Sequence, residues 1–143
     1  MESMENLSRY SDRDKAIDMA LWRNFTTCKQ RQTVGVVKSI HGDYLIVPID
    51  NEVFVASEYE RLVKTYKKMT YEQIKCIRMQ YDPLDHWQSL SGMFATSSGA
   101  LLRYILSMQI PLERWIRYEL AIRGYDQDGQ WVGFNKAASI WLK

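Results

Sequence analysis

Residues Met69 to Leu106 have the sequence MTYEQIKCIRMQYDPLDHWQSLSGMFATSSGALLRYIL. The spacing of the apolar residues in this stretch predicts three short helices joined by tight turns. Thr70 and Gln73 have the T-x-x-Q spacing of a capping box, so the first helix is expected to begin there. Pro83 cannot continue a helix and predicts where it ends.

The rest of this stretch predicts a second and a third helix. The second is expected from Asp85 to Phe94, with Asp85 as its N-cap. Ser97 or Ser98 can cap the third, in which apolar residues recur at helical intervals. Those apolar residues are Leu101, Leu102, Ile105 and Met108.

Three motifs in this stretch carry a resemblance: EQI followed by IR and a tyrosine, a short helix of the Q-x-L-x-x-x-F type, and a helix begun by serine. Together they resemble the helix-turn-helix that accompanies phage homing endonucleases and site-specific recombinases, and they cover about a quarter of the chain. The resemblance implies that the third helix enters the DNA major groove. Its DNA-facing surface would be Ser97, Ser98, Gly99, Ala100 and Arg103, and its packing positions Leu90, Phe94, Leu101 and Ile105.

A local block of basic residues precedes and overlaps the first of these helices. Between Arg61 and Arg78 there are six basic residues and one acidic residue, Glu72. Such a block is suited to phosphate contacts, although a solvated helix face would carry the same charges. With the implied recognition helix, it predicts a double-stranded DNA interface made of Lys64, Lys67, Lys68, Lys75, Arg78, Ser97, Ser98 and Arg103.

The alternative is a protein-interaction module, such as a phage protein that binds and inhibits or redirects a host RNA polymerase or defence complex. The net charge is only +2, Arg103 is the only basic residue of the third helix, and five Trp and nine Tyr supply a surplus of aromatic surface. The expected partner-binding residues are Arg114, Trp115, Arg117 and Tyr118.

The segments before residue 69 predict a small antiparallel sheet preceded by a helix. We expect a mobile arm over residues 1–10, a helix from after Ser11 to about Thr27, and two or three valine-rich strands within about residues 33–56. Pro48 predicts an edge or an interruption in its strand. Ser57 and Glu60 form a second capping box, which predicts a helix through residue 66.

After the three helices, Pro111 and Gly124 are placed as the first-turn proline and the C-terminal glycine of a further helix. Residues 124–136 are compatible either with a tight turn at Asp128 and Gly129 between extended residues or with part of a helix, and residues 137–142 again predict helix. The expected fold is therefore α+β and mostly α, in a single domain over residues 1–143 with a helix-turn-helix-like bundle.

The sequence gives no support to enzyme chemistry. His41 and His86 share no motif, and Cys28 and Cys76 match no metal-ligand spacing, so we expect no catalytic residue, metal or cofactor and expect buried free thiols. No apolar run approaches the length of a membrane span, and no signal peptide is present at the start, which predicts a cytoplasmic protein without a membrane partner. The oligomeric state is not predicted.

Overall fold

The computed structural model describes residues 8–27, 33–50, 53–63 and 65–143. The chain divides into two compact units, Met1–Gly92 and Met93–Lys143, called the N-terminal and C-terminal units below. Six α-helices and a three-stranded antiparallel sheet lie within the described residues, which confirms the predicted α+β, mostly α class. The prediction of a single domain stays a prediction.

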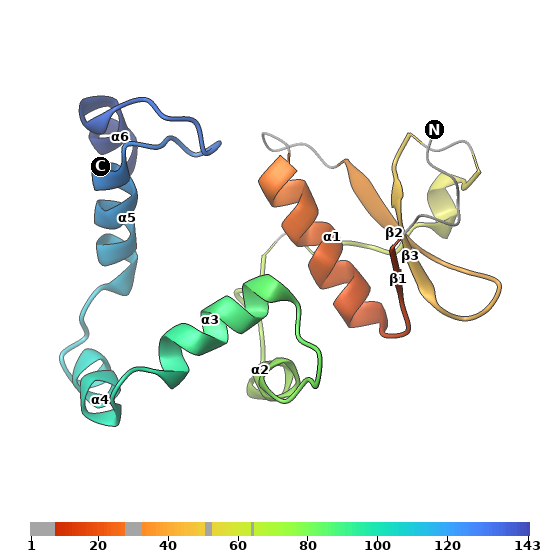
Figure 1. The fold of residues 1–143 in the computed structure, drawn as a ribbon, viewed down its shortest axis with the longest axis horizontal. Coiled ribbons are helices and arrows are strands. Elements are labelled where there is room, and N and C mark those ends of the chain that lie inside the picture. Colours follow the sequence, from red (N-terminus) through yellow and green to blue (C-terminus); the bar gives the residue numbers. More distant parts are fainter. Residues whose placement is uncertain (1–7, 28–32, 51–52, 64) are drawn as a thin grey trace. The chain divides into compact units, whose positions relative to one another are not determined.

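The sheet of the N-terminal unit has the order β1-β3-β2, with β3 (Tyr44–Pro48) in the centre (Figure 1). β2 (Val34–Lys38) pairs with all of β3, whereas β1 (Ser8–Tyr10) pairs only as far as Ile46. We expected an edge strand or an interruption at Pro48; β3 is the central strand, and it ends at Pro48. The proline is tolerated because it is the last residue of β3 and lies beyond the end of β1, where no neighbouring strand needs its missing N–H.

Each face of the sheet is covered by a different segment. Helix α1 (Arg13–Thr27) packs on one face, where Ala16, Ile17 and Ala20 join Val36 and Ile46 in a buried cluster. On the other face, Val37, Leu45 and Val47 are buried beneath Phe54 and Tyr59. Neighbouring residues of β2 and β3 thus alternate between two apolar layers, as the period of a strand requires.

The free edge of β2 is closed by side chains and by a neighbouring segment. At the two ends of β2, the Thr33 carbonyl accepts from the Ile49 amide and the Ser39 amide donates to the Asp43 carbonyl. Because alternate residues of an antiparallel strand bond to the same neighbour, the backbone groups of Val34 and Val36 point away from β3. The Asn24 side chain accepts from the amides of Thr33 and Val34 at 2.8 and 2.9 Å and donates to the Val34 carbonyl at 3.1 Å. The Glu60 amide donates to the Val36 carbonyl.

The structure corrects two predictions in this unit. Residues 8–10, placed in a mobile arm, form β1, and residues 1–7 of that arm lie outside the described residues. The expected helix over residues 57–66 is replaced by a single 3-10 turn, η2 (Ala56–Glu58). The described residues between this turn and the start of α2 are not helical. The reason is tertiary and local: Tyr59 bridges to Val37, and the Glu58 carboxylate accepts from the Val55 amide at 2.8 Å. Residues 53–56, expected as a further strand, form no strand either.

The three helices of the stretch 69–106 form where the sequence predicts them. α2 (Tyr71–Arg78) has the Thr70 capping box, α3 (Asp85–Ala95) begins after Pro83, and α4 (Gly99–Ser107) is capped by the Ser98 hydroxyl. The expected packing is not observed, because neither α2 nor α4 contains a buried residue. Leu90, Phe94 and Leu101 are exposed by 43, 45 and 50 %, and Ile105 is half-buried. The boundary between the two units falls inside α3.

The C-terminal unit contains a helical hairpin. α5 (Leu112–Arg123) packs against α6 (Phe134–Trp141), with Ala121 and Ala137 fully buried (Figure 1). Gly124 ends α5 in the left-handed conformation, at φ 79°, as predicted. Between the helices, the Asp126 carboxylate accepts from the amides of Asp128 and Gln130 and forms a tight turn closed by a bridge from Tyr125 to Trp131. Of the two alternatives for residues 124–136, the tight turn is therefore observed within residues 125–131, while residues 134–136 belong to α6.

Candidate functional site

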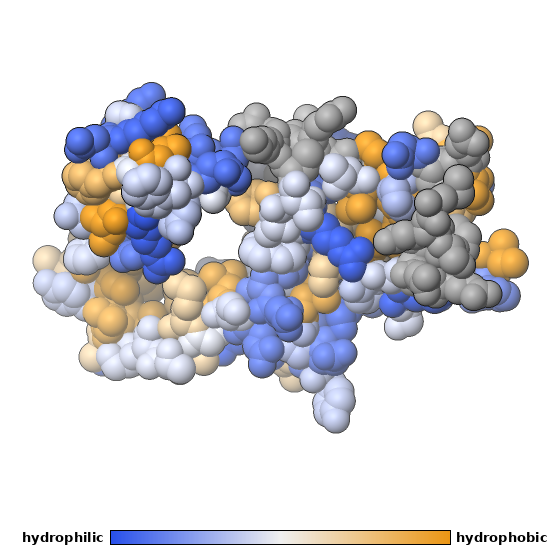
Figure 2. All heavy atoms as spheres, turned by 45° about the horizontal axis from the view of Figure 1, so that its top comes forward, coloured by the Kyte–Doolittle hydropathy of each residue, from blue (hydrophilic) through white to orange (hydrophobic). Residues whose placement is uncertain are grey.

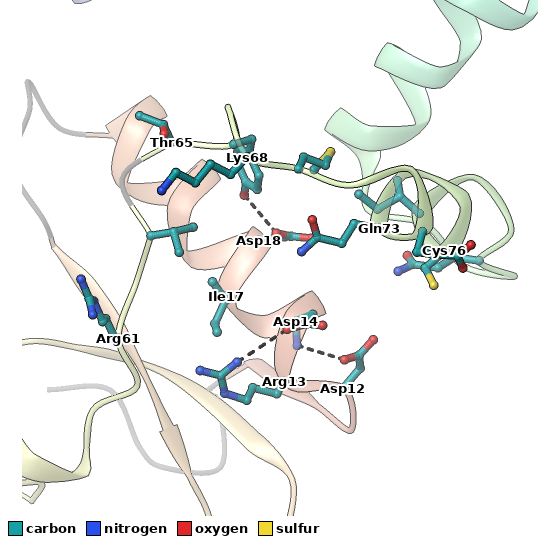
Figure 3. Close-up of a pocket in the computed structure, with 16 residues that line it drawn as sticks. Asp12, Arg13, Asp14, Ile17, Asp18, Arg61, Thr65, Lys68, Gln73 and Cys76 are labelled. Atoms are coloured by element: carbon teal, nitrogen blue, oxygen red, sulfur yellow. Dashed lines mark hydrogen bonds and ion pairs between the residues drawn. The ribbon is translucent and has the colours of Figure 1, made fainter.

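The N-terminal unit has a pocket of about 510 Å³ between α1, the chain segment 61–69 and α2 (Figure 3). The capping box that begins α2 and the apolar stripe that fixes α1 on the sheet set two of its walls. Its lining includes carboxylates from α1 and α2, basic side chains from segment 61–69 and several apolar residues. The volume is within the range of small-molecule sites.

Asp18 lies within this pocket and has an unusual set of partners. Its carboxylate accepts from the Tyr66 hydroxyl at 3.0 Å and from the Trp87 indole N–H at 3.1 Å, and neither donor carries a charge. Burial raises the pKa of Asp18, these two hydrogen bonds oppose that rise, and the negative charges of Asp14 and Asp12 add to it. The carboxylate is thus partly removed from water, and no cation of the described residues pairs with it.

The basic side chains of the pocket do not pair with Asp18. In Figure 3 the ammonium end of Lys68 points away from Asp18, and Arg61 lies on the far side of Ile17. Within the described part of the chain, no carboxylate forms an ion pair with Arg61 or Lys68. Arg13 is different, because it pairs with Glu60 at 3.1 Å and with Asp14 at 3.6 Å.

An aromatic cluster surrounds the two residues that donate to Asp18. Trp87 is buried and meets the Tyr66 ring edge-on at 5.2 Å, while His86 stacks on Trp22 at 4.7 Å between the ring centroids. Burial lowers the pKa of His86. The cluster connects α1 to α3 and fixes the two donors that reach Asp18.

A second candidate site is the apolar surface of the C-terminal unit. The fully buried residues of this unit are Ala121, Gly124 and Ala137, so no large side chain forms a core within it. Leu106, Trp115 and Trp131 are exposed by 80, 67 and 72 %. Figure 2 shows apolar side chains in orange at the surface on the left, where Figure 1 places α4 to α6. Exposed apolar surface of this extent is a common feature of interaction sites.

The predicted DNA-binding residues do not all belong to one unit. Lys67, Lys68, Lys75 and Arg78 are exposed in the N-terminal unit, whereas Ser97, Ser98 and Arg103 belong to the C-terminal unit. In that second set Ser98 and Arg103 are exposed, Ser97 is half-buried, and the Ser98 hydroxyl is used to cap α4. Lys64 lies outside the described residues. A joint DNA-binding surface stays a prediction.

The predicted partner-binding residues lie together on α5 but do not have equal access to solvent. Trp115 and Tyr118 are exposed by 67 and 55 %, and Arg114 is exposed as well. Arg117 is half-buried: it bonds to Glu113 on its own helix at 3.1 Å and to the Trp141 carbonyl of α6 at 3.4 Å. Arg117 therefore contributes to the hairpin.

Sequence reasoning missed the pocket, because its residues come from segments that are far apart in the chain. The available signal was the series Asp12, Asp14 and Asp18, whose last two members are one turn apart on α1. Cys76 lines the pocket and is exposed, which corrects the expectation of a buried thiol, and Cys28 lies outside the described residues. Among the described residues, no group of acidic, histidine and cysteine side chains is arranged to hold a metal ion.

None of the helices in the described part of the chain has both the length and the apolar character to cross a membrane. No protein-family model, no curated protein and no solved structure matches this chain.

Proposed function

We propose that this protein is a non-enzymatic protein-interaction module whose C-terminal unit docks on a partner protein through the outer face of α5. The observation that carries the proposal is the burial pattern of the unit: its fully buried residues are no larger than alanine, while most of its Trp, Tyr, Leu and Ile side chains are exposed and the rest are only half-buried. Exposed apolar surface of this kind is stabilised when a partner removes it from water.

The outer face of α5 consists of Leu112, Trp115, Tyr118 and Ile122. These residues recur at three- and four-residue intervals. Leu112 and Trp115 lie on the side of the helix away from Ala121, which packs toward α6, and Tyr118 and Ile122 lie at the flanks. The exposed fractions of all four residues range from 42 to 67 %. An apolar helix face with this spacing fits an apolar groove on another protein, and aromatic residues at its centre are the usual anchors of such interfaces.

The charges beside this face leave it accessible. Glu113 pairs with Arg117 and Glu119 pairs with Arg123 along the helix, at 3.1 and 2.7 Å. These pairs are exposed and contribute little to stability, but they keep four charges paired within the helix, including Glu119, which lies one turn after Trp115. Trp115 is thus left as the main feature that a partner would meet.

Double-stranded DNA binding is the alternative, and one experiment separates the two. The purified protein is titrated with random-sequence duplex DNA at low and moderate salt, and immobilised protein is compared with its Trp115→Ser variant for retention of proteins from the cells that produce it. Tyr81→Ser is the matched control, because Tyr81 is fully exposed but belongs to the N-terminal unit.

Our proposal expects no salt-dependent DNA binding and one or more specific proteins that are retained by the wild type and Tyr81→Ser but lost with Trp115→Ser. Tight DNA binding that weakens steeply with salt would instead support the helix-turn-helix prediction. Equal retention by all three proteins would contradict the role of α5.

A further inference from the structure

We propose that the pocket of the N-terminal unit binds a small zwitterion of the ω-amino acid class, with its ammonium group at Asp18 and its carboxylate at Arg61 and Lys68. This site is separate from the outer face of α5 and does not depend on the proposed docking function. It follows from the Asp18 carboxylate on one side of the pocket and from Arg61 and Lys68 on another, none of which forms an ion pair among the described residues, whereas Arg13 and Asp14 of the same lining pair with each other.

The ammonium end of the ligand is set by Asp18. Partial burial of this carboxylate costs free energy of hydration, and its two donors are neutral, so no ion pair offsets that cost. Each of its oxygens has a second lone pair, so an ammonium group with three donors can bind without displacing Tyr66 or Trp87. Asp14 and Glu72 also line the pocket and add negative potential on this side.

The carboxylate end is set by Arg61 and Lys68. Arg61 offers a planar fork of N–H donors that matches a carboxylate, and Lys68 adds a second positive charge. Both side chains line the pocket and are exposed, and Figure 3 shows them on a different side from the Asp18 carboxylate. A single ligand with both charges would satisfy the two sides together, whereas an ion of one sign would satisfy only one side.

The apolar lining predicts the part of the ligand between its charges. Ile17, Val63 and Ile77 contribute to the pocket wall, so a short alkyl chain is expected to connect the amine and the carboxylate. A pocket of about 510 Å³ accommodates the whole of such a molecule.

The test is calorimetric titration of the full chain with 4-aminobutyrate and 6-aminohexanoate at low ionic strength, with butylamine and butyrate as probes of one charge each. We expect a Kd of about 1 mM for the better zwitterion and binding at least about tenfold weaker for each single-charge probe. Arg61→Gln with Lys68→Gln should weaken zwitterion binding about tenfold and leave butylamine binding unchanged. Lys67→Gln is the matched control, because Lys67 is a neighbouring exposed lysine that does not line the pocket.

Asp18→Asn should abolish binding of both the zwitterion and butylamine, and its far-UV circular dichroism reports whether the fold is kept. Zwitterion binding no tighter than butylamine binding, or an equal loss with Lys67→Gln, would overturn the proposal. Absence of any heat of binding by the folded wild type up to about 50 mM of either zwitterion would overturn it as well.

Discussion

Asn24 allows the account of the N-terminal unit to be tested quantitatively. Asn24→Ala removes one hydrogen bond donated to the Val34 carbonyl, two accepted from the amides of Thr33 and Val34, and a longer one of 3.2 Å accepted from the Thr33 hydroxyl. Each such bond contributes about 1 kcal/mol net, and water replaces part of the loss at this half-buried edge, so we expect the free energy of unfolding to fall by about 2 kcal/mol. Asn24→Asp keeps an acceptor for the two amides and should lose less.

Native-state amide hydrogen exchange of β2 and β3, read by NMR, measures this effect within the unit concerned. A loss of about 2 kcal/mol corresponds to roughly thirtyfold faster exchange of the most protected amides. Thr26→Ala is the control, because its hydroxyl bonds only within the last turns of α1, to the carbonyls of Trp22 and Arg23, and about 0.5 kcal/mol or less is expected. If Asn24→Ala and Thr26→Ala changed exchange equally, the proposed closure of the β2 edge would be refuted.

Three further changes test other parts of the structure. Gly35→Ala should destabilise the N-terminal unit by about 1 to 3 kcal/mol in urea unfolding, because a Cβ there would lie 2.6 Å from the Tyr59 ring. A Cβ at Gly92 would have no atom within 4 Å, so Gly92→Ala should stabilise α3 by up to about 1 kcal/mol. If Gly92→Ala were the more destabilising of the two, the packing described would be contradicted. Ser98→Ala should cost about 1 kcal/mol and reduce the helical circular dichroism signal, since the hydroxyl accepts from the Leu101 amide at 3.1 Å, and an unchanged signal would show that the cap is dispensable. Burial lowers the pKa of His86 from its ordinary 6.5, so as the pH falls the unfolded chain binds this proton before the folded chain does. The free energy of unfolding should therefore decrease as the pH falls below about 6.5, and His86→Gln should reduce that decrease. The same pH dependence in both proteins would contradict a buried His86.

The helices that could be predicted are those whose ends are specified by local chemistry. Thr70 and Gln73 begin α2, Ser98 begins α4, and Gly124 ends α5, each through bonds or backbone conformations within a few residues. The valine-rich pattern likewise identified β2 and β3. In contrast, β1 is a three-residue strand whose existence depends on pairing with distant residues of β3, and its own sequence carries no strand pattern.

The expected helix over residues 57–66 shows how tertiary contacts override a local signal. Ser57 and Glu60 have the sequence spacing of a capping box, but no helix forms there. Instead, Tyr59 packs over Gly35 and bridges to Val37, on the face of the sheet that α1 does not cover. The Glu60 amide is used by β2 and is therefore not available to a helix.

The candidate sites divide in the same way. The aromatic face of α5 was predicted in part, since helical spacing alone places Trp115 beside Tyr118 and both are exposed. The pocket could not be predicted, because its defining contact joins Asp18 of α1 to Tyr66 and Trp87, which are 48 and 69 residues further along the chain.

Site-specific photo-crosslinking is the decisive test of docking through the outer face of α5. A photoreactive phenylalanine analogue is placed at position 115, and at position 81 as the control, in the cells that produce the protein. Our account predicts a discrete adduct with another protein from position 115 and none from position 81. Adducts only with DNA or with a second copy of this chain, equal adducts from both positions, or no adduct from position 115 would contradict docking through the outer face of α5.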